Sequence, residues 1–354
     1  MRLRPDIRYS VIRLGGTVAC LIALTCACDP APVSRAPAML SAAIPFTAAN
    51  GSNALARVAA LCTLGPRDAG TPGAARTAQW LAAELQRHGL AAGIDTFTNE
   101  TPAGPLVCRN VLATILPRTE GGPGAPRTGS AHDLQQSRHL PARGAHGPPV
   151  ETPGGCIVLL SHFDTKSGIS TNFVGANDGG SSTGLLLELA RVLGSTPLRQ
   201  CHVLFGFLDG EECRVQYGPR DGFHGSHRLA AQLAAGKRHI RAVILLDMVG
   251  DRDLSITLPD NGTLHLTLLA LEAAKTAGVR NSFRLADRRI LDDHQAFLDA
   301  GFPAVDLIDF VYGSAPGRHD YWHTPDDTLD KLSATSLTAV GQVVVEMLRQ
   351  LDAR

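Results

Sequence analysis

The chain has 354 residues, enough for one large α/β domain or two smaller ones with a sizeable hydrophobic core. Lys and Arg together number 33, as do Asp and Glu, so the formal net charge is zero. This balance argues against the basic surface of a nucleic-acid-binding protein and against the charge excess of a disordered chain. With 44% hydrophobic residues, the composition is that of an ordinary soluble globular protein.

The first 28 residues differ from the rest of the chain. Positive charges lie in MRLRPDIRYSVIR, and the apolar stretch TVACLIALTCAC that follows is too short to span a bilayer as a mature helix. We interpret residues 1–28 as an export signal, which predicts a protein located in the periplasm or secreted. Ala27-Cys28 also resembles the cleavage site of bacterial lipoproteins, with Leu24 displaced by one position from the usual spacing, and plain secretion is the alternative.

A lipid on Cys28 would tether the protein to a membrane through acyl chains rather than through a spanning helix. Residues 29–45, rich in Pro, Ala and Ser, are predicted to form a tether. Residues 46–354 then form the predicted catalytic domain. Nothing in the sequence requires more than a monomer.

Five cysteines remain after the signal, and no two of them form a CxxC pair, which argues against a thiolate zinc cluster. One or two disulfides could form in an oxidising compartment, but the sequence alone does not pair them. For Cys156 and Cys201, which lie in strand patterns, we favour buried free thiols.

The first regular element of the domain is an amphipathic helix at about 74–87, within RDAGTPGAARTAQWLAAELQRHG, which begins with a turn and ends near Gly89. A strand follows near 110–116. Residues 117–154 are rich in Gly, Pro and polar residues and lack apolar periodicity, so we predict a disordered surface insertion between two neighbouring strands. We interpret its three histidines as solvated rather than metal-binding.

Strands and helices alternate along the rest of the chain. This order predicts a three-layer α/β/α sandwich around a central, mostly parallel mixed sheet. The strands are predicted at 156–161, 201–208, 241–246 and 303–308, and the helices at about 182–194, 224–235, 264–277 and 335–351.

Acidic residues and histidines follow several of the apolar runs. The carboxyl ends of parallel strands converge on one crevice, so these side chains are expected to meet in space. Oxygen and nitrogen ligands without thiolate suit a catalytic zinc ion. The residues concerned are His162, Asp164, Asp178, Glu211, Glu212, Asp247, Asp292, Asp293, His294 and His323.

The segment Asp209-Gly210-Glu211-Glu212 is the strongest of these signals. Three carboxylates directly after an apolar strand would repel one another unless a positive charge compensates them. A metal bound by one glutamate, with the adjacent glutamate as proton shuttle, resolves the conflict. A solvated charged turn is the alternative.

The other signals are weaker when taken singly. His162 and Asp164 could be a satisfied polar strand end, or Asp164 could orient a ligand. Asp178, in the glycine-rich GANDGG, could be a turn or N-cap residue instead of a ligand. Trp322 and His323 could be a packing tryptophan beside an exposed histidine.

Together, in chain order, these motifs resemble the zinc-dependent M28 aminopeptidase superfamily. Within it, further segments are similar to the glutaminyl cyclases, or glutaminyl-peptide cyclotransferases. The resemblance covers roughly residues 60–350 apart from the insertion. The segments are GTPGAARTAQWLAAEL, DGEECRVQYGPRDGFHGSHRLA, LDDHQAFLDAGFPAVDLID and YWHTPDDTLDKL.

The resemblance implies one zinc ion per chain, held by Asp178, Glu212 and His323, with Glu211 as general acid and base. It implies further that Asp247 and Asp293 share a hydrogen-bond network beside the metal. Two aromatic residues, Trp322 and Tyr217, would line the substrate pocket.

Two departures from the family pattern stand out, and one shared feature fits both activities. Tyr217 occupies a position that carries tryptophan in animal cyclases. Ser161 and Thr183 occupy positions that carry a disulfide in animal members, which implies that this bond is absent here. His162 and Asp247, which bind a second zinc in the aminopeptidases, are retained in cyclases as well, so they do not distinguish the two activities.

The implied activity is conversion of the N-terminal glutamine of peptides or proteins to pyroglutamate, with release of ammonia. Because the nucleophile is the substrate's own α-amine, neither a second zinc nor an activated water is needed. The alternative is a two-zinc aminopeptidase that uses His162 and Asp247 as well and releases N-terminal amino acids. A third hypothesis is a binding module without activity, which the intact set of acids and histidines argues against.

Overall fold

The computed structural model describes residues 43–118, 154–218 and 220–353. The predicted export signal, Cys28, most of the predicted tether and most of the predicted insertion lie outside these residues and stay predictions. Within the described part of the chain, every helix is too short or too polar to cross a membrane.

The described residues form an eight-stranded mixed sheet in the order β1-β2-β4-β3-β5-β8-β6-β7. The central strands β4, β3, β5 and β8 run parallel to one another, whereas β2 pairs antiparallel with both β1 and β4, and β6 pairs antiparallel with β8. The strands are β1 (Ala92–Thr101), β2 (Gly104–Ile115), β3 (Cys156–His162), β4 (His202–Leu208), β5 (Ile240–Asp247), β6 (Ile256–Leu258), β7 (Phe283–Leu285) and β8 (Ala304–Ile308).

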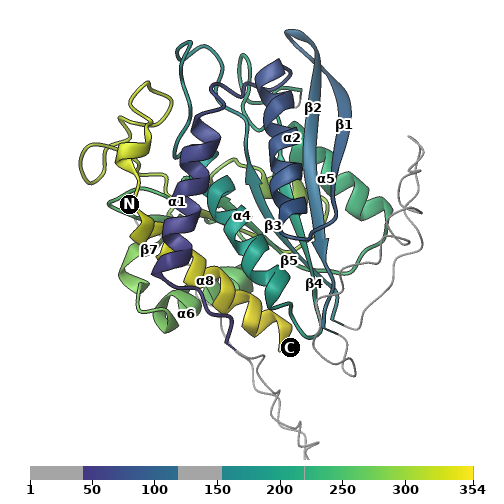
Figure 1. The fold of residues 1–354 in the computed structure, drawn as a ribbon, viewed down its shortest axis with the longest axis vertical. Helices are drawn as coiled ribbons and strands as arrows, with labels where there is room; N and C mark the ends of the chain where they lie inside the picture. Colours follow the sequence, from purple (N-terminus) through teal and green to yellow (C-terminus); the bar gives the residue numbers. More distant parts are fainter. Residues whose placement is uncertain (1–42, 119–153, 219, 354) are drawn as a thin grey trace, which may run out of the picture. The chain divides into compact units, whose positions relative to one another are not determined.

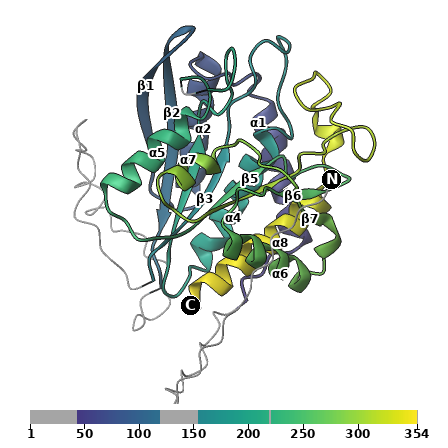
Figure 2. The ribbon, with the colours of Figure 1, turned by 180° about the vertical axis from the view of Figure 1, so that it is seen from behind.

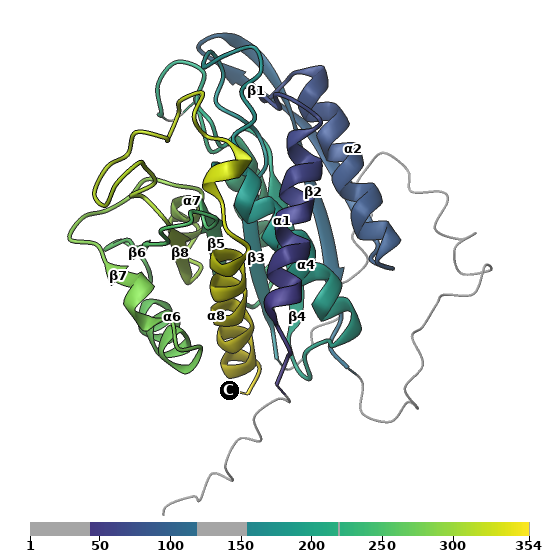
Figure 3. The same ribbon diagram turned by 60° about the vertical axis from the view of Figure 1, so that its left-hand side comes forward.

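Helices cover both faces of this sheet, which confirms the predicted three layers. In Figure 1 one helical layer lies in front of the strands, and Figure 3 shows it beside the sheet. It contains α1 (Ala48–Cys62), α2 (Pro72–Arg87), α4 (Gly180–Ser195) and α8 (Ala334–Asp352), with α6 (Leu264–Thr276) packed on α8. The opposite face, seen in Figure 2, carries α5 (His224–Ala235) and α7 (His294–Asp299).

The central strands are apolar throughout because both of their faces are buried. In β3, Ile157 and Leu159 pack into the hydrophobic cluster under α1, α4 and α8. The alternate residues Val158 and Leu160 pack into the cluster under α5 and α7. The polar side chains of the site therefore begin only where each strand ends.

The predicted helix at 74–87 begins two residues earlier, at Pro72. The hydroxyl of Thr71 accepts a hydrogen bond from the backbone N–H of Ala74 at 3.3 Å, which caps the helix. Pro72 fits the first turn because its missing N–H would have no helical partner there.

Helix α1 and strand β1 were not predicted. Helix α1 begins with the sequence AANGSN, whose Asn and Gly have low helix propensity. Its stability comes from packing against α4 and α8. At Gly51 an added Cβ would lie 2.0 Å from Thr338 Oγ1, so only glycine allows this close approach to α8. The five cysteines of the described residues are free, and Cys156 and Cys201 are buried as expected.

A substitution in the sheet tests the importance of this core. Leu159→Ala should lower the free energy of unfolding by about 2–5 kcal/mol, because Leu159 is fully buried and its loss leaves a cavity. Urea denaturation would measure the change. The control Leu264→Ala removes a side chain from a residue that is 70% exposed, and it should change stability by less than about 0.5 kcal/mol. Equal effects of the two substitutions would contradict this account.

Candidate active site

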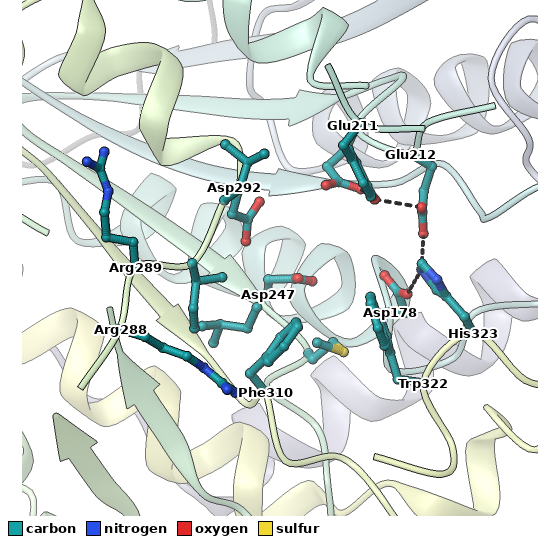
Figure 4. A pocket seen from close by; sticks show the side chains of 15 residues that line it. Asp178, Glu211, Glu212, Asp247, Arg288, Arg289, Asp292, Phe310, Trp322 and His323 are labelled. Carbon is teal, nitrogen blue, oxygen red and sulfur yellow. Dashed lines mark hydrogen bonds and ion pairs between the residues drawn. The ribbon is translucent and has the colours of Figure 1, made fainter. Parts of the chain in front are cut away.

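The acidic residues and histidines of the sequence motifs converge at the carboxyl ends of three neighbouring strands. His162 ends β3, Asp247 ends β5, and Glu211 and Glu212 lie in the turn after β4. Since β3 lies between β4 and β5 with all three parallel, these ends are side by side. Asp178 joins them from the loop before α4, and Figure 4 shows most of this set around one pocket.

His323 faces two carboxylates in this cluster. Its Nε2 lies 2.9 Å from Glu212 Oε1 and 3.2 Å from Asp178 Oδ2. Burial alone would lower the pKa of His323, but its hydrogen bonds with Asp178 and Glu212 raise that pKa to about 10. A proton on His323 thus compensates part of the charge of the two carboxylates, and a divalent cation at the same place would compensate all of it.

The donor atoms of Asp178, Glu212 and His323 fit a zinc ion. They lie within 4.8 Å of one another, and all are oxygen or nitrogen. The ligand atoms of a tetrahedral zinc ion with bonds of about 2.0 Å are themselves about 3.3 Å apart, which matches the spacing of His323 Nε2 to both carboxylates. Asp178 Oδ2 is buried, and its close polar contact among the described residues is with His323 Nε2, the other candidate ligand, as expected of two atoms that share a metal ion.

A second group of donors shares Asp178. The Nε2 atom of His162 lies 3.2 Å from Asp178 Oδ1 and 3.3 Å from Asp247 Oδ1. Burial lowers the pKa of His162, but hydrogen bonds with Asp164, Asp178 and Asp247 outweigh it and raise the pKa well above its ordinary value. The candidate second-site residues are therefore close enough to bind a second ion.

Two buried carboxylates hold the backbone that carries the ligands. Asp164 accepts hydrogen bonds from the backbone N–H groups of Glu211 and Glu212, both at 3.1 Å. Asp327 accepts from Asn177 N at 2.7 Å and from Asp178 N at 3.1 Å. Each bond is charge-assisted and buried, so each fixes a ligand loop firmly.

Arg67 links the same loops and was not singled out in the sequence. Its side chain is fully buried, and its guanidinium donates to the carbonyl oxygens of Phe163 at 2.7 Å, Val174 at 2.6 Å and Gly175 at 3.2 Å. It therefore ties the end of β3 to the loop that carries Asp178. No local pattern around Arg67 indicates this role, because its partners are backbone atoms about 100 residues away.

Glu211 lines the pocket next to the ligand Glu212. Burial, followed by the charge of Glu212, raises the pKa of Glu211 well above its ordinary range. The hydroxyl of Tyr217 donates to Glu212 Oε2 at 2.9 Å and lies 3.3 Å from Glu211 Oε2. Tyr217 is among the residues that line this pocket, and its hydroxyl also links the two glutamates.

Aromatic side chains form one wall of the pocket. Trp322 stacks on the ring of His323 with centroids 4.1 Å apart, and Phe310 packs against Trp322 at 5.3 Å. His323 has a φ of 53°, a left-handed conformation that turns its ring toward the carboxylates. The cavity that these residues enclose measures ≈ 260 Å³ and is lined by both polar and apolar side chains.

The structure places Asp292, rather than Asp293, in the pocket. Asp292 lines the cavity with Asp247, and burial together with the charge of Asp247 raises the pKa of Asp292 well above its ordinary range. Asp293 is fully buried and does not line the cavity. Both residues stand at the start of α7, so the sequence could not tell which of the two faces the crevice.

The hydroxyls of Ser161 and Thr183 lie 3.1 Å apart, within hydrogen-bonding distance. Both are fully buried beside the site. Thr183 also donates to the carbonyl oxygen of His162 at 2.9 Å. Polar contacts between these two residues therefore connect β3 and α4 beside the site.

Comparisons with known proteins agree with this geometry. The model of peptidase family M28 matches residues 148–348. The glutaminyl-peptide cyclotransferase-like protein of Bos taurus is 28% identical over 318 residues, covering 80% of this chain and 72% of that protein.

Two solved structures extend the comparison. The crystal structure of an Acidobacteriales bacterium glutaminyl cyclase is 30% identical, has a TM-score of 0.72, and is matched over 92% of this chain and 99% of that one. A Zn-dependent exopeptidase from Parabacteroides distasonis is 25% identical with a TM-score of 0.68, over 86% of this chain and 98% of that one. The family model covers more than half of the chain, and the chain therefore belongs to peptidase family M28.

Proposed function

We propose that the protein is a zinc-dependent glutaminyl-peptide cyclotransferase, which converts an N-terminal glutamine to pyroglutamate and releases ammonia. The observation that carries this proposal is the match to a glutaminyl cyclase structure at 30% identity over 99% of that chain. Curated relatives named glutaminyl-peptide cyclotransferases support the same activity. Peptides or proteins that begin with glutamine are thus the proposed substrates.

In this proposal one zinc ion is held by Asp178, Glu212 and His323. Zinc bound there would polarise the γ-carbonyl of the substrate glutamine. The small cavity beside these residues, walled by Trp322 and Phe310, would receive the glutamine side chain and exclude water.

Glu211 moves the proton in the proposed reaction. The bond between the α-nitrogen and the γ-carbonyl carbon forms, and the bond between that carbon and its amide nitrogen breaks. Glu211 accepts a proton from the attacking α-amine and donates it to the departing nitrogen, which leaves as ammonia. The raised pKa of Glu211 suits this role, because the carboxyl group can hold the proton between the two steps.

Asp247 and Asp292 would stabilise the reacting groups from the other side of the pocket. Burial, followed by the charge of Asp247, raises the pKa of Asp292, so the carboxyl group of Asp292 can retain a proton and donate it in a hydrogen bond. This assigns to Asp292 the role that the sequence analysis expected of Asp293.

The group formed by His162, Asp178 and Asp247 favours a second candidate function. A two-zinc aminopeptidase would use these residues for a second ion, with Glu211 activating water. The match to a Zn-dependent exopeptidase at 25% identity is in line with this candidate. The number of zinc ions and the reaction product distinguish the two functions.

Glu211→Gln should retain zinc but lower kcat by at least about 100-fold, because the amide cannot carry the proton. Elemental analysis would measure the zinc, and a coupled assay of released ammonia would measure the rate. Glu272→Gln, at an exposed position of α6, is the matched control and should keep full activity. An active Glu211→Gln variant would remove Glu211 from the mechanism.

Asp292→Asn should lower kcat/KM at least about tenfold, equivalent to 1.4 kcal/mol of transition-state stabilisation, because Asp292 lines the pocket. Asp293→Asn should mainly lower the thermal unfolding midpoint, since Asp293 is buried away from the cavity. Steady-state kinetics and thermal melts of both variants would measure these effects. If Asp293→Asn instead lowers kcat/KM and Asp292→Asn mainly lowers the thermal unfolding midpoint, Asp293 is the residue that acts in the site.

The purified protein should contain one zinc ion per chain. Removal of this ion with a chelator should lower the thermal unfolding midpoint, because the clustered carboxylates lose their compensating charge. Elemental analysis and melting curves with and without chelator would test both points. Two zinc ions per chain, with a peptide shortened by its first residue in mass spectra, would support the aminopeptidase instead.

A further inference from the structure

We propose that Arg288 and Arg289 form a cationic end of the active-site pocket that selects peptides with a carboxylate shortly after the N-terminal glutamine. This inference rests on the cyclotransferase function proposed above and concerns the choice among its substrates. Both arginines lie in the segment between β7 and Asp292, and both line the same cavity as the candidate zinc ligands.

The two arginines lie across the pocket from the candidate zinc ligands. Figure 4 shows Arg288 and Arg289 on the side of the cavity opposite Glu212 and His323. A peptide whose glutamine side chain faces His323 would therefore extend its following residues toward the arginines.

The arginines place positive charge at their end of the pocket. The acidic residues among the lining are Asp178, Glu211, Glu212, Asp247 and Asp292, of which Asp292 lies nearest to the arginines (Figure 4), and the basic ones are the two arginines and the candidate ligand His323. The acidic end attracts the amino terminus of a peptide, whereas it repels a carboxylate. A peptide with a carboxylate beyond its first residue is thus a dipole that this pocket can orient.

The charges of both arginines are available to a ligand. Both residues are exposed, and across residues 43–118, 154–218 and 220–353 neither guanidinium forms an ion pair with a carboxylate. Arg289 donates instead to the neutral side-chain oxygen of Gln295 at 3.2 Å. A substrate carboxylate would therefore not have to displace an existing acidic partner.

The backbone that carries the arginines is held in place by Asn261. Its side chain accepts a hydrogen bond from Ile290 N at 3.1 Å and donates to the carbonyl oxygen of Ile290 at 3.0 Å. The carbonyl oxygen of Arg288 accepts from Asp260 N at 3.1 Å. The segment is anchored on both sides of Arg289, so the two side chains start from defined positions.

The distances suit a carboxylate on the second or third residue of the substrate. Arg289 stands three positions before Asp292, so their Cα atoms lie at most about 11 Å apart. Two residues of an extended peptide span at most about 7 Å, and the arginine side chain bridges the remainder. The exposed side chain of Leu291 lines the cavity between Arg289 and Asp292 and offers an apolar surface to the intervening residue.

The test compares peptides that differ in one residue, for which Gln-Ala-Ala-Ala-amide, Gln-Glu-Ala-Ala-amide, Gln-Ala-Glu-Ala-amide and Gln-Lys-Ala-Ala-amide are suitable. The wild-type protein should cyclise a glutamate peptide with a higher kcat/KM than the alanine peptide, and the lysine peptide with a lower one. Each exposed ion pair contributes up to about fivefold, and the preference should shrink at high salt because the arginines are solvent-exposed. The free dipeptide Gln-Ala, compared with its amide, shows whether a terminal carboxylate is selected in the same way.

The arginine variants decide the origin of the preference. In the Arg288→Gln/Arg289→Gln double variant the ratio of kcat/KM for the glutamate peptide to that for the alanine peptide should fall to about 1. In the Arg288→Glu/Arg289→Glu double variant this ratio should fall below 1, and the lysine peptide should become a better substrate than the alanine peptide. Arg284→Gln, which removes the same charge from β7 outside the pocket lining, should leave the wild-type ratio unchanged.

Two results would overturn the inference alone. One is a wild-type ratio near 1 while the alanine peptide is cyclised, and the other is a ratio that survives the double substitution. If the wild-type protein cyclises none of the peptides, the proposed function fails, and this inference fails with it. Cyclisation of the alanine peptide therefore reports on the function, and the ratio reports on the arginines.

Discussion

Repulsion among buried carboxylates, gathered at the carboxyl ends of the central strands, governs how the site and its supporting loops are built. Asp178, Glu211, Glu212, Asp247 and Asp292 all line one small cavity. Such a group is stable only with compensating positive charge, which two histidines supply as protons or which a divalent cation supplies. The acids therefore both create the metal site and tune one another's protonation. Burial and the same crowding raise the pKa of Glu211, the residue proposed to move the proton.

A second set of buried charges keeps the site rigid. Asp164 and Asp327 each accept two backbone hydrogen bonds from the ligand loops, and Arg67 donates three to the segments around them. These bonds satisfy backbone groups that would otherwise be buried without partners. They replace the regular hydrogen bonds that the chain loses where its strands end. Removal of any of the three side chains would release a loop that carries candidate ligands, and those ligands would lose their positions around the site.

The shared architecture explains why one family can support two reactions. The second donor group, with His162 and Asp247, is complete here, as an aminopeptidase would require. In a cyclotransferase the same residues can serve as hydrogen-bonding partners, because the substrate supplies its own nucleophile. In the proposed function, the choice between the reactions would therefore rest on the pocket walls, which include Trp322, Tyr217 and Asp292, more than on the ligands themselves.

Much of this site could be predicted from local patterns. Apolar runs that end in His162, Asp247 or the Glu211-Glu212 pair indicate buried parallel strands whose ends converge, and the structure brings those residues together. Helix α1 could not be predicted, because Gly51 is unfavourable in an isolated helix and suits α1 only through its contact with α8. The order of the strands, with β3 between β4 and β5, also follows from long-range pairing rather than from any local signal.

Local patterns along the chain were enough to predict the central strands, the acids and histidines at their ends, and the family that these motifs resemble. Which member of the Asp292-Asp293 pair faces the cavity became clear from the folded chain alone, since neighbouring residues at a helix start point in different directions. The folded chain also shows that Arg67 supports the ligand loops and that Arg288 and Arg289 line the pocket. The physical reason is common to these cases: each role depends on partners distant in sequence, and chain folding alone brings them within contact.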